Sequence, residues 1–151
     1  MSVFRLCRSP VVACHRVPLK EVSKYGVIRP GRWVSRIVAM VNSLIEKPAA
    51  DQAPSDMVLT GRYVLTPEIF DALEDTAPGS GGEIQLTDAL SLLCKDTRRG
   101  APVYACLFEG KPYHVGDPVG LLTASIELAL ARDDLKEHLA ERLSDILKRG
   151  L

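Results

Sequence analysis

Two charged side chains with complementary chemistry stand where an apolar run ends and a proline follows. Glu46 and Lys47 come directly before Pro48 and after the mainly apolar residues 37–45. A carboxylate accepts hydrogen bonds from the paired hydroxyls of a sugar, and an ammonium neutralises a phosphate. Ligands of open α/β sheets bind beyond the strand ends, so the position favours a ligand site. A solvated charge pair at a strand end also fits these residues, and on the tripeptide alone it is the favoured interpretation of the two.

The elements that must position these side chains alternate between strands and helices. Runs rich in apolar and β-branched residues predict strands over 11–17, 36–45, 57–65 and 103–108, and a hairpin turn at 109–110 with a return strand over 113–115. Helical patterns predict a short turn over 20–24 and helices over 66–75, 84–94, 118–132 and 134–149. The alternation predicts an α/β fold, layered within a single domain over residues 1–151.

Three of the predicted helices carry more specific expectations. Thr66, Pro67 and Glu68 form a helix start, and the helix should bury Ile69, Phe70 and Leu73. The helix over 118–132 is apolar on most sides, which predicts burial against two partners. The helix over 134–149 is amphipathic and ends where Gly150 can cap it.

Composition excludes several classes of protein. Lys+Arg and Asp+Glu both number 19, so the formal net charge is zero, and a nucleic-acid binder would show a basic excess or stripe. No apolar run approaches the roughly 20 residues that span a bilayer, so we expect no membrane segment and a cytoplasmic location. The four cysteines lack the spacing of a zinc site, and we expect free thiols.

An ordered series of short motifs carries a resemblance to a known family. The series comprises Tyr25-Gly26-Val27-Ile28, Glu46-Lys47-Pro48, Gly61-Arg62-Tyr63-Val64-Leu65, the Gly-Gly-Glu-Ile-Gln-Leu-Thr-Asp run over 81–88, Phe108-Glu109-Gly110-Lys111 and Gly116-Asp117-Pro118-Val119-Gly120. In this order, and from about Val11 to Leu143, the chain resembles the C-terminal, sugar-binding portion of bacterial UTP–glucose-1-phosphate uridylyltransferases.

The resemblance implies a fold, a reaction and a set of site residues. The fold would be a partial doubly wound nucleotidyltransferase sheet, Rossmann-like, lacking its N-terminal nucleotide-binding strands and followed by C-terminal helices. The reaction would form UDP-glucose from UTP and glucose 1-phosphate with Mg²⁺. Gly26 would bring its backbone against the sugar, Glu46 would hold glucose hydroxyls, Lys47 would pair with the sugar phosphate, and Arg62 would lie near the site. Glu83 and Asp88 stand at the start of a predicted helix. They either stabilise the helix dipole, as acids at this end do, or contact the substrate.

The chain also departs from the family pattern. The Gly-x-Gly-Thr-Arg nucleotide loop and the acidic metal-binding segment are missing, and residues 1–10 diverge. His114 stands where the family has a metal-ligating aspartate, and imidazole suits Mg²⁺ poorly. We therefore expect a truncated chain that is inactive alone. The alternative is a non-catalytic module that binds sugar phosphate, or that forms homo-oligomers or associates with full-length enzyme.

Overall fold

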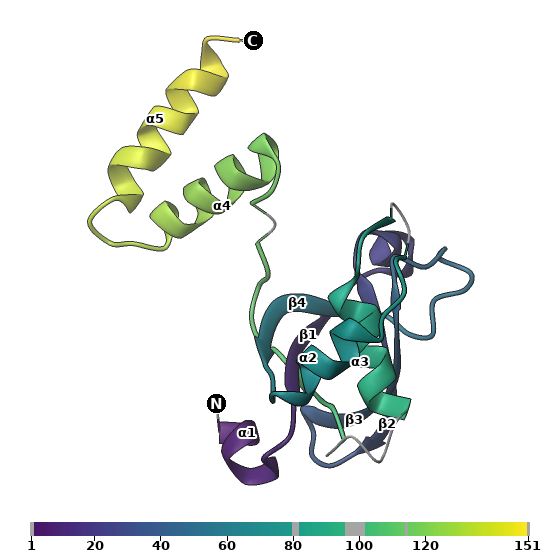
Figure 1. Ribbon diagram of the computed structural model, residues 1–151. Helices are drawn as coiled ribbons and strands as arrows, with labels where there is room; N and C mark the ends of the chain where they lie inside the picture. The colour runs from purple at the N-terminus through teal and green to yellow at the C-terminus, as the bar shows by residue number, and fades with distance from the viewer. Residues whose placement is uncertain (1, 80–81, 96–101, 114, 151) are drawn as a thin grey trace. The chain divides into compact units, whose positions relative to one another are not determined.

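The computed structural model describes residues 2–79, 82–95, 102–113 and 115–150, which divide into two compact units (Figure 1). The first unit, Met1–Gly110, contains every described strand, and the second, Lys111–Leu151, is helical. The single domain stays a prediction. The N-terminal residues 1–10 contain α1 (Ser2–Cys7), and their divergence from the family also stays a prediction.

Five strands of the first unit close into a barrel. They are β1 (Val11–Arg16), β2 (Gly26–Trp33), β3 (Val38–Glu46), β4 (Met57–Val64) and β5 (Tyr104–Leu107), in the order β1-β4-β2-β3-β5. The ring closes because β1 pairs with β5, and this pairing is parallel while the other four are antiparallel. Burial in these strands comes in runs: Val11, Val12, Cys14 and His15 are buried in β1, and Met57, Val58 and Leu59 at the start of β4.

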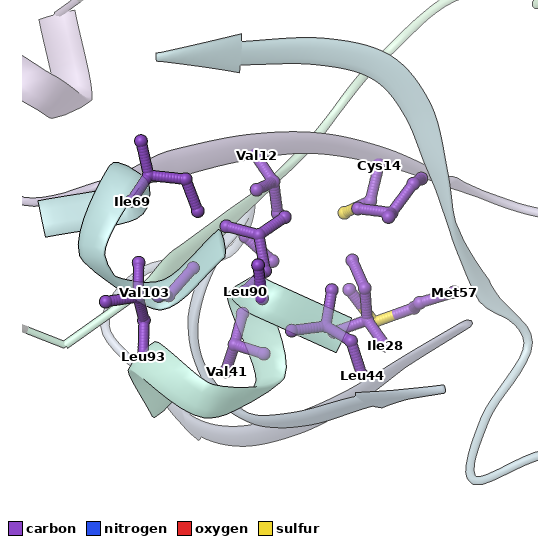
Figure 2. Packing of buried hydrophobic residues seen from close by; sticks show 14 residues of the cluster. Val12, Cys14, Ile28, Val41, Leu44, Met57, Ile69, Leu90, Leu93 and Val103 are labelled. Atoms are coloured by element: carbon purple, nitrogen blue, oxygen red, sulfur yellow. The ribbon is translucent and has the colours of Figure 1, made fainter. Parts of the chain in front are cut away.

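Two helices complete the core of the first unit. The helix α2 (Glu68–Glu74) lies beside α3 (Leu86–Lys95), and α3 packs on β3. Leu90 and Leu93 of α3 meet Val12, Val41 and other strand residues in one buried cluster (Figure 2). A smaller cluster of Val22, Val27 and Val58 lies under η1 (Leu19–Lys24), a 3₁₀ helix. The core therefore ties α3 to the strand that ends at Glu46.

The second unit consists of α4 (Pro118–Leu130) and α5 (Lys136–Lys148), which contact each other. The Asp117 carboxylate accepts a hydrogen bond from the Gly120 N–H at 2.9 Å and caps α4. The predicted helix end at Gly150 is supported by its φ of +71°, a conformation that glycine adopts without strain. Among the described helices, none combines the length and apolar character that crossing a membrane requires.

Most predicted elements are found, and the mixed α/β class is confirmed. Strand predictions matched β1, β3, β4 and β5, and helix predictions matched α2 to α5 within a few residues. The strand β2 was missed because its Gly26 start and its Pro30-Gly31 pair are typical of turns. The predicted hairpin after β5 is wrong for the described residues. The strand β5 pairs with β1 and β3, and residues 111–113 and Val115 are not in a strand.

Two expectations about surfaces are wrong. The partial sheet that the resemblance implies would expose an edge, but the described strands close on themselves through the β1–β5 pairing. Phe70 is 67% exposed, because α2 turns Ile69 and Ala72 toward the core instead. The burial of α4 against two partners stays a prediction.

Candidate functional site

Gly26 and Glu46 lie side by side because the start of β2 pairs with the end of the antiparallel strand β3. Gly26 is the first residue of β2, Glu46 is the last residue of β3, and the two are direct partners in the ladder. Lys47 follows Glu46, and its N–H donates to the Tyr25 carbonyl at 3.0 Å. Three residues that the sequence predicts as one site are thereby brought to one end of the β2–β3 pair.

The hydroxyl of Thr87 holds the Glu46 carboxylate. Thr87 Oγ1 donates to Glu46 Oε2 at 2.5 Å, and Thr87 is buried near the start of α3. The other carboxylate oxygen, Oε1, lies 3.9 Å from the Lys47 Nζ. The side chain of Glu46 is 20% exposed and that of Lys47 is 62% exposed. The carboxylate is thus fixed on one side by a neutral donor, while the ammonium reaches into solvent.

Gly26 leaves the space in which this hydrogen bond forms. A Cβ added to Gly26 would lie 2.9 Å from Thr87 Oγ1, 3.1 Å from Glu46 Oε2 and 2.8 Å from Leu59 Cδ1. Side chains do not tolerate contacts this short, so any larger residue would push these atoms apart. The requirement for glycine here arises from the protein's own side chains, and a sugar approaching its backbone stays a prediction.

Lys47 adopts a backbone conformation that few residues with a side chain adopt. Its φ is +42°, in the left-handed region, which costs a residue with a Cβ about 1–2 kcal/mol. The hydrogen bond to Tyr25 and the following Pro48 hold the turn in place. Strained residues of this kind cluster at ligand sites, where the strain fixes a side chain in position.

Tyr63 is a second polar group that the charge of the Glu46 carboxylate influences. Burial raises the pKa of the Tyr63 phenol, and the negative charge of Glu46 raises it further. Tyr63 also packs against the main core cluster from β4. The phenol therefore remains a neutral hydrogen-bonding group near Glu46 across the physiological pH range.

Arg62 makes a local hydrogen bond within its own strand. The Arg62 guanidinium is exposed and donates to the carbonyl of Gly61 at 3.3 Å, a local contact on β4. Its role toward a substrate stays a prediction. His114 lies outside the described residues. Within the described residues no group of three His, Cys, Asp or Glu side chains is found that could hold a metal ion, and Mg²⁺ stays a prediction.

A hollow of about 570 Å³ is lined by residues of the same two elements, β3 and α3. Its lining includes Ile45 and Asp88, the sequence neighbours of Glu46 and Thr87, together with Ser91 and Lys95 of α3. Gly26, Glu46 and Lys47 do not line it. The predicted site residues therefore lie outside this hollow, and the Glu46 and Lys47 side chains approach each other.

Sequence reasoning missed Thr87 and Tyr63. Thr87 belongs to the Leu-Thr-Asp run that opens α3, where a hydroxyl suggests a helix cap, and its partner lies 41 residues away. Tyr63 follows Arg62 in an apolar strand, where an aromatic residue suggests core packing. The one available signal was strand alternation. Arg62 and Tyr63 are adjacent in β4 and face opposite sides of the strand, so an outward Arg62 indicates an inward Tyr63.

Comparison with known proteins places these residues in a family. A family model described as nucleotidyl transferase matches residues 8–130. A UTP–glucose-1-phosphate uridylyltransferase of Streptococcus pneumoniae is 44% identical over 145 residues, which cover 93% of this chain and 47% of that protein. A UTP–glucose-1-phosphate uridylyltransferase of Bacillus subtilis is 40% identical, with 99% of this chain and 48% of that protein covered. The chain thus spans about half the length of the curated relatives it matches.

Solved structures agree with the sequence relatives. A UDP-glucose pyrophosphorylase complexed with UDP-glucose superposes with a TM-score of 0.79 at 40% identity, covering 87% of this chain and 48% of that one. A UTP-bound enzyme of the same type from Acinetobacter baumannii gives a TM-score of 0.77 at 28% identity, covering 94% and 47%. The resemblance predicted from the ordered motifs is confirmed by both comparisons.

Proposed function

This chain belongs to the nucleotidyl transferase family, and on that premise we propose that it supplies the sugar-phosphate-binding part of a UTP–glucose-1-phosphate uridylyltransferase. One observation carries the proposal. At the end of β3, a carboxylate held by Thr87 and an ammonium free to reach solvent lie 3.9 Å apart, in a chain 44% identical to such an enzyme.

The two charges suit the two ends of glucose 1-phosphate. Glu46 keeps acceptor capacity on Oε1 for sugar hydroxyls, because Thr87 occupies Oε2. Lys47 is bound loosely to Glu46 and is largely exposed, so turning toward a phosphate costs little. A phosphate is also a stronger partner for the ammonium than a distant carboxylate. We infer that Glu46 orients the sugar and Lys47 neutralises its phosphate.

The rest of the reaction requires groups beyond this site. Nucleotidyl transfer depends on positioning and on cationic stabilisation of the phosphates. Mg²⁺ would supply that charge, and within the described residues no group of three His, Cys, Asp or Glu side chains could hold a metal ion. We propose that the barrel forms part of a larger doubly wound sheet in the complete enzyme, and that the 151-residue chain binds substrate without turnover.

Calorimetry with glucose 1-phosphate and UDP-glucose tests the proposal. We expect both ligands to bind, and Glu46→Gln and Lys47→Gln each to weaken binding roughly tenfold, as loss of a charge-assisted hydrogen bond does. Glu74→Gln and Lys20→Gln serve as controls, because both residues are exposed on other elements. Equal binding by all four variants, or the absence of binding by the unaltered chain, would overturn the assignment.

Self-association and location complete the proposal. Val119, Leu121, Leu122 and Leu128 give α4 an exposed apolar surface, which supports a homo-oligomer or association with full-length enzyme. Light scattering should show a mass above that of the monomer, and Leu122→Glu should lower it. A monomer at high concentration would contradict this part. A cytoplasmic location, where nucleotide sugars are made, remains part of the same proposal.

A further inference from the structure

We infer that Thr87 is a positioning residue for sugar binding, acting through the orientation of the Glu46 carboxylate. The inference rests on the proposed function, because it assigns Glu46 to the sugar. It adds a residue whose hydroxyl selects which of the two carboxylate oxygens faces the ligand.

Two hydroxyls of α3 engage β3 in matching register. Thr87 donates to Glu46 Oε2, and one turn later the Ser91 hydroxyl accepts the Leu44 N–H at 3.4 Å. Four residues of helix rise about 6 Å, and two residues of strand rise about 6.6 Å. The two spacings agree, so one face of α3 lies along the last residues of β3 with both hydroxyls opposite their partners.

This contact fixes a side chain that would otherwise rotate. Glutamate has three side-chain torsions, and holding them for a ligand costs entropy unless the protein has already done so. Thr87 is 6% exposed, on a helix whose Leu90 is fully buried, so its hydroxyl is a rigid donor. Gly26 keeps the space around the donor and acceptor open. Oε2 is thereby committed to the protein, and Oε1 is left toward Lys47 and a bound sugar.

Removing the hydroxyl should weaken sugar binding without removing any group that touches the ligand. Thr87→Val keeps the branched shape and loses the donor, so we expect glucose 1-phosphate to bind roughly tenfold more weakly. Thr87→Ser keeps the donor and should bind within about twofold of the unaltered chain. Thr76→Val is the matched control, because Thr76 is similarly buried but donates to the Ala72 carbonyl in α2.

A double-mutant cycle separates positioning from general stability. If Thr87 acts through Glu46, then Thr87→Val should cost nothing further in a Glu46→Ala background, which lacks the acceptor, and the two losses should not add. A merely structural role would give the same loss in both backgrounds, and that result would overturn the inference. Equal binding by Thr87→Val and the unaltered chain would overturn it as well. If the valine variant does not fold, Thr87→Ala removes the same hydroxyl with a smaller side chain.

A second measurement needs no ligand. The NMR chemical shift of the Glu46 carboxyl carbon should move in Thr87→Val and stay in place in Thr87→Ser and Thr76→Val. If the unaltered chain binds neither glucose 1-phosphate nor UDP-glucose while this shift moves as expected, the proposed function fails and the Thr87–Glu46 contact stands. If the shift does not move, the inference fails whatever the chain binds.

Discussion

Gly26 and Glu46 are direct partners across the β2–β3 ladder, and a Cβ on Gly26 would lie 3.1 Å from Glu46 Oε2. The same position would lie within 3 Å of atoms of Thr87 and Leu59. These neighbours belong to β3, α3 and β4, so the space is bounded by three elements. The absence of a side chain at residue 26 is what lets the carboxylate and the hydroxyl approach each other.

Replacing Gly26 by alanine should therefore destabilise the first unit. Overpacking of a closed site costs typically about 1–3 kcal/mol of unfolding free energy. Urea unfolding should show a lower midpoint with an unchanged slope. Gly79→Ala is a suitable control, because the Cβ there would meet the end of the Asp88 side chain at 3.1 Å, which can move aside. Equal midpoints for Gly26→Ala and the unaltered chain would contradict the packing described above.

The phenol of Tyr63 should titrate above its ordinary value of 10.0. Burial is the main cause of the raised pKa, and the Glu46 charge is the second, so Glu46→Gln should lower this pKa only in part. Ultraviolet absorbance of tyrosinate during an alkaline titration measures it, and subtraction of the Tyr63→Phe curve isolates it among the four tyrosines. A Tyr63 pKa unchanged by Glu46→Gln would show that the two side chains do not interact.

The same shift determines how Tyr63 contributes to stability as pH rises. A folded-state pKa above the unfolded value means that folding favours the neutral phenol. The contribution is fully present below the unfolded pKa near 10 and is lost as pH rises through the folded-state pKa. Unfolding free energy should accordingly fall in this alkaline window, and it should fall less steeply in Tyr63→Phe. An identical slope in both proteins would count against the assignment.

Two cysteines should resist modification while the chain is folded. Burial, together with the nearby Cys106, raises the pKa of Cys14 to about 12. Burial also raises the pKa of Cys94 to about 12, although the charge of Lys95 acts to lower it. The thiolate is the reactive form, so both should react slowly with a thiol reagent at pH 8 and rapidly after unfolding. All four cysteines are free in the structure, as the sequence predicts. Mass spectrometry after brief alkylation identifies the sites, and early labelling of Cys14 or Cys94 would refute the prediction.

Local sequence patterns predicted most of the elements, because each depends on residues near one another. The apolar run that begins at Val11 and the Thr-Pro-Glu start before α2 are signals of this kind. The closure of the barrel is different, because it depends on β1 pairing with β5 about 90 residues later. Nothing in the composition of either strand specifies that pairing. The strand β2 was lost for a related reason: its turn-like Pro30-Gly31 pair is accommodated by a register shift against β3.

The site was predictable only in part. Glu46, Lys47 and Gly26 are predicted as site residues because their order in the chain matches a family, and the β2–β3 register explains why they lie together. Thr87 was not found, because its role arises from a contact between α3 and β3 rather than from its neighbours in sequence. Arg62 shows the converse case, since its motif matched the family but its described hydrogen bond is local.

Lys47 offers a test in which stability and binding should change in opposite directions. Its left-handed φ of +42° costs about 1–2 kcal/mol, whereas a glycine there gives up roughly 0.5–1 kcal/mol of chain entropy. Lys47→Gly should therefore raise the unfolding free energy by on the order of 0.5 kcal/mol. It should also weaken glucose 1-phosphate binding, because the ammonium is gone. Urea unfolding and calorimetry measure the two effects.

The matched variant Lys47→Ala separates the backbone from the charge. Alanine removes the ammonium but keeps the Cβ that makes a positive φ costly, so binding should fall as it does in Lys47→Gly while stability gains nothing. Because stability and activity often oppose each other at ligand sites, a gain seen in the glycine variant alone would indicate that the chain retains strain here to hold a cation. A loss of stability in Lys47→Gly would show that the turn is unstrained. Unchanged binding in both variants would remove Lys47 from the phosphate site.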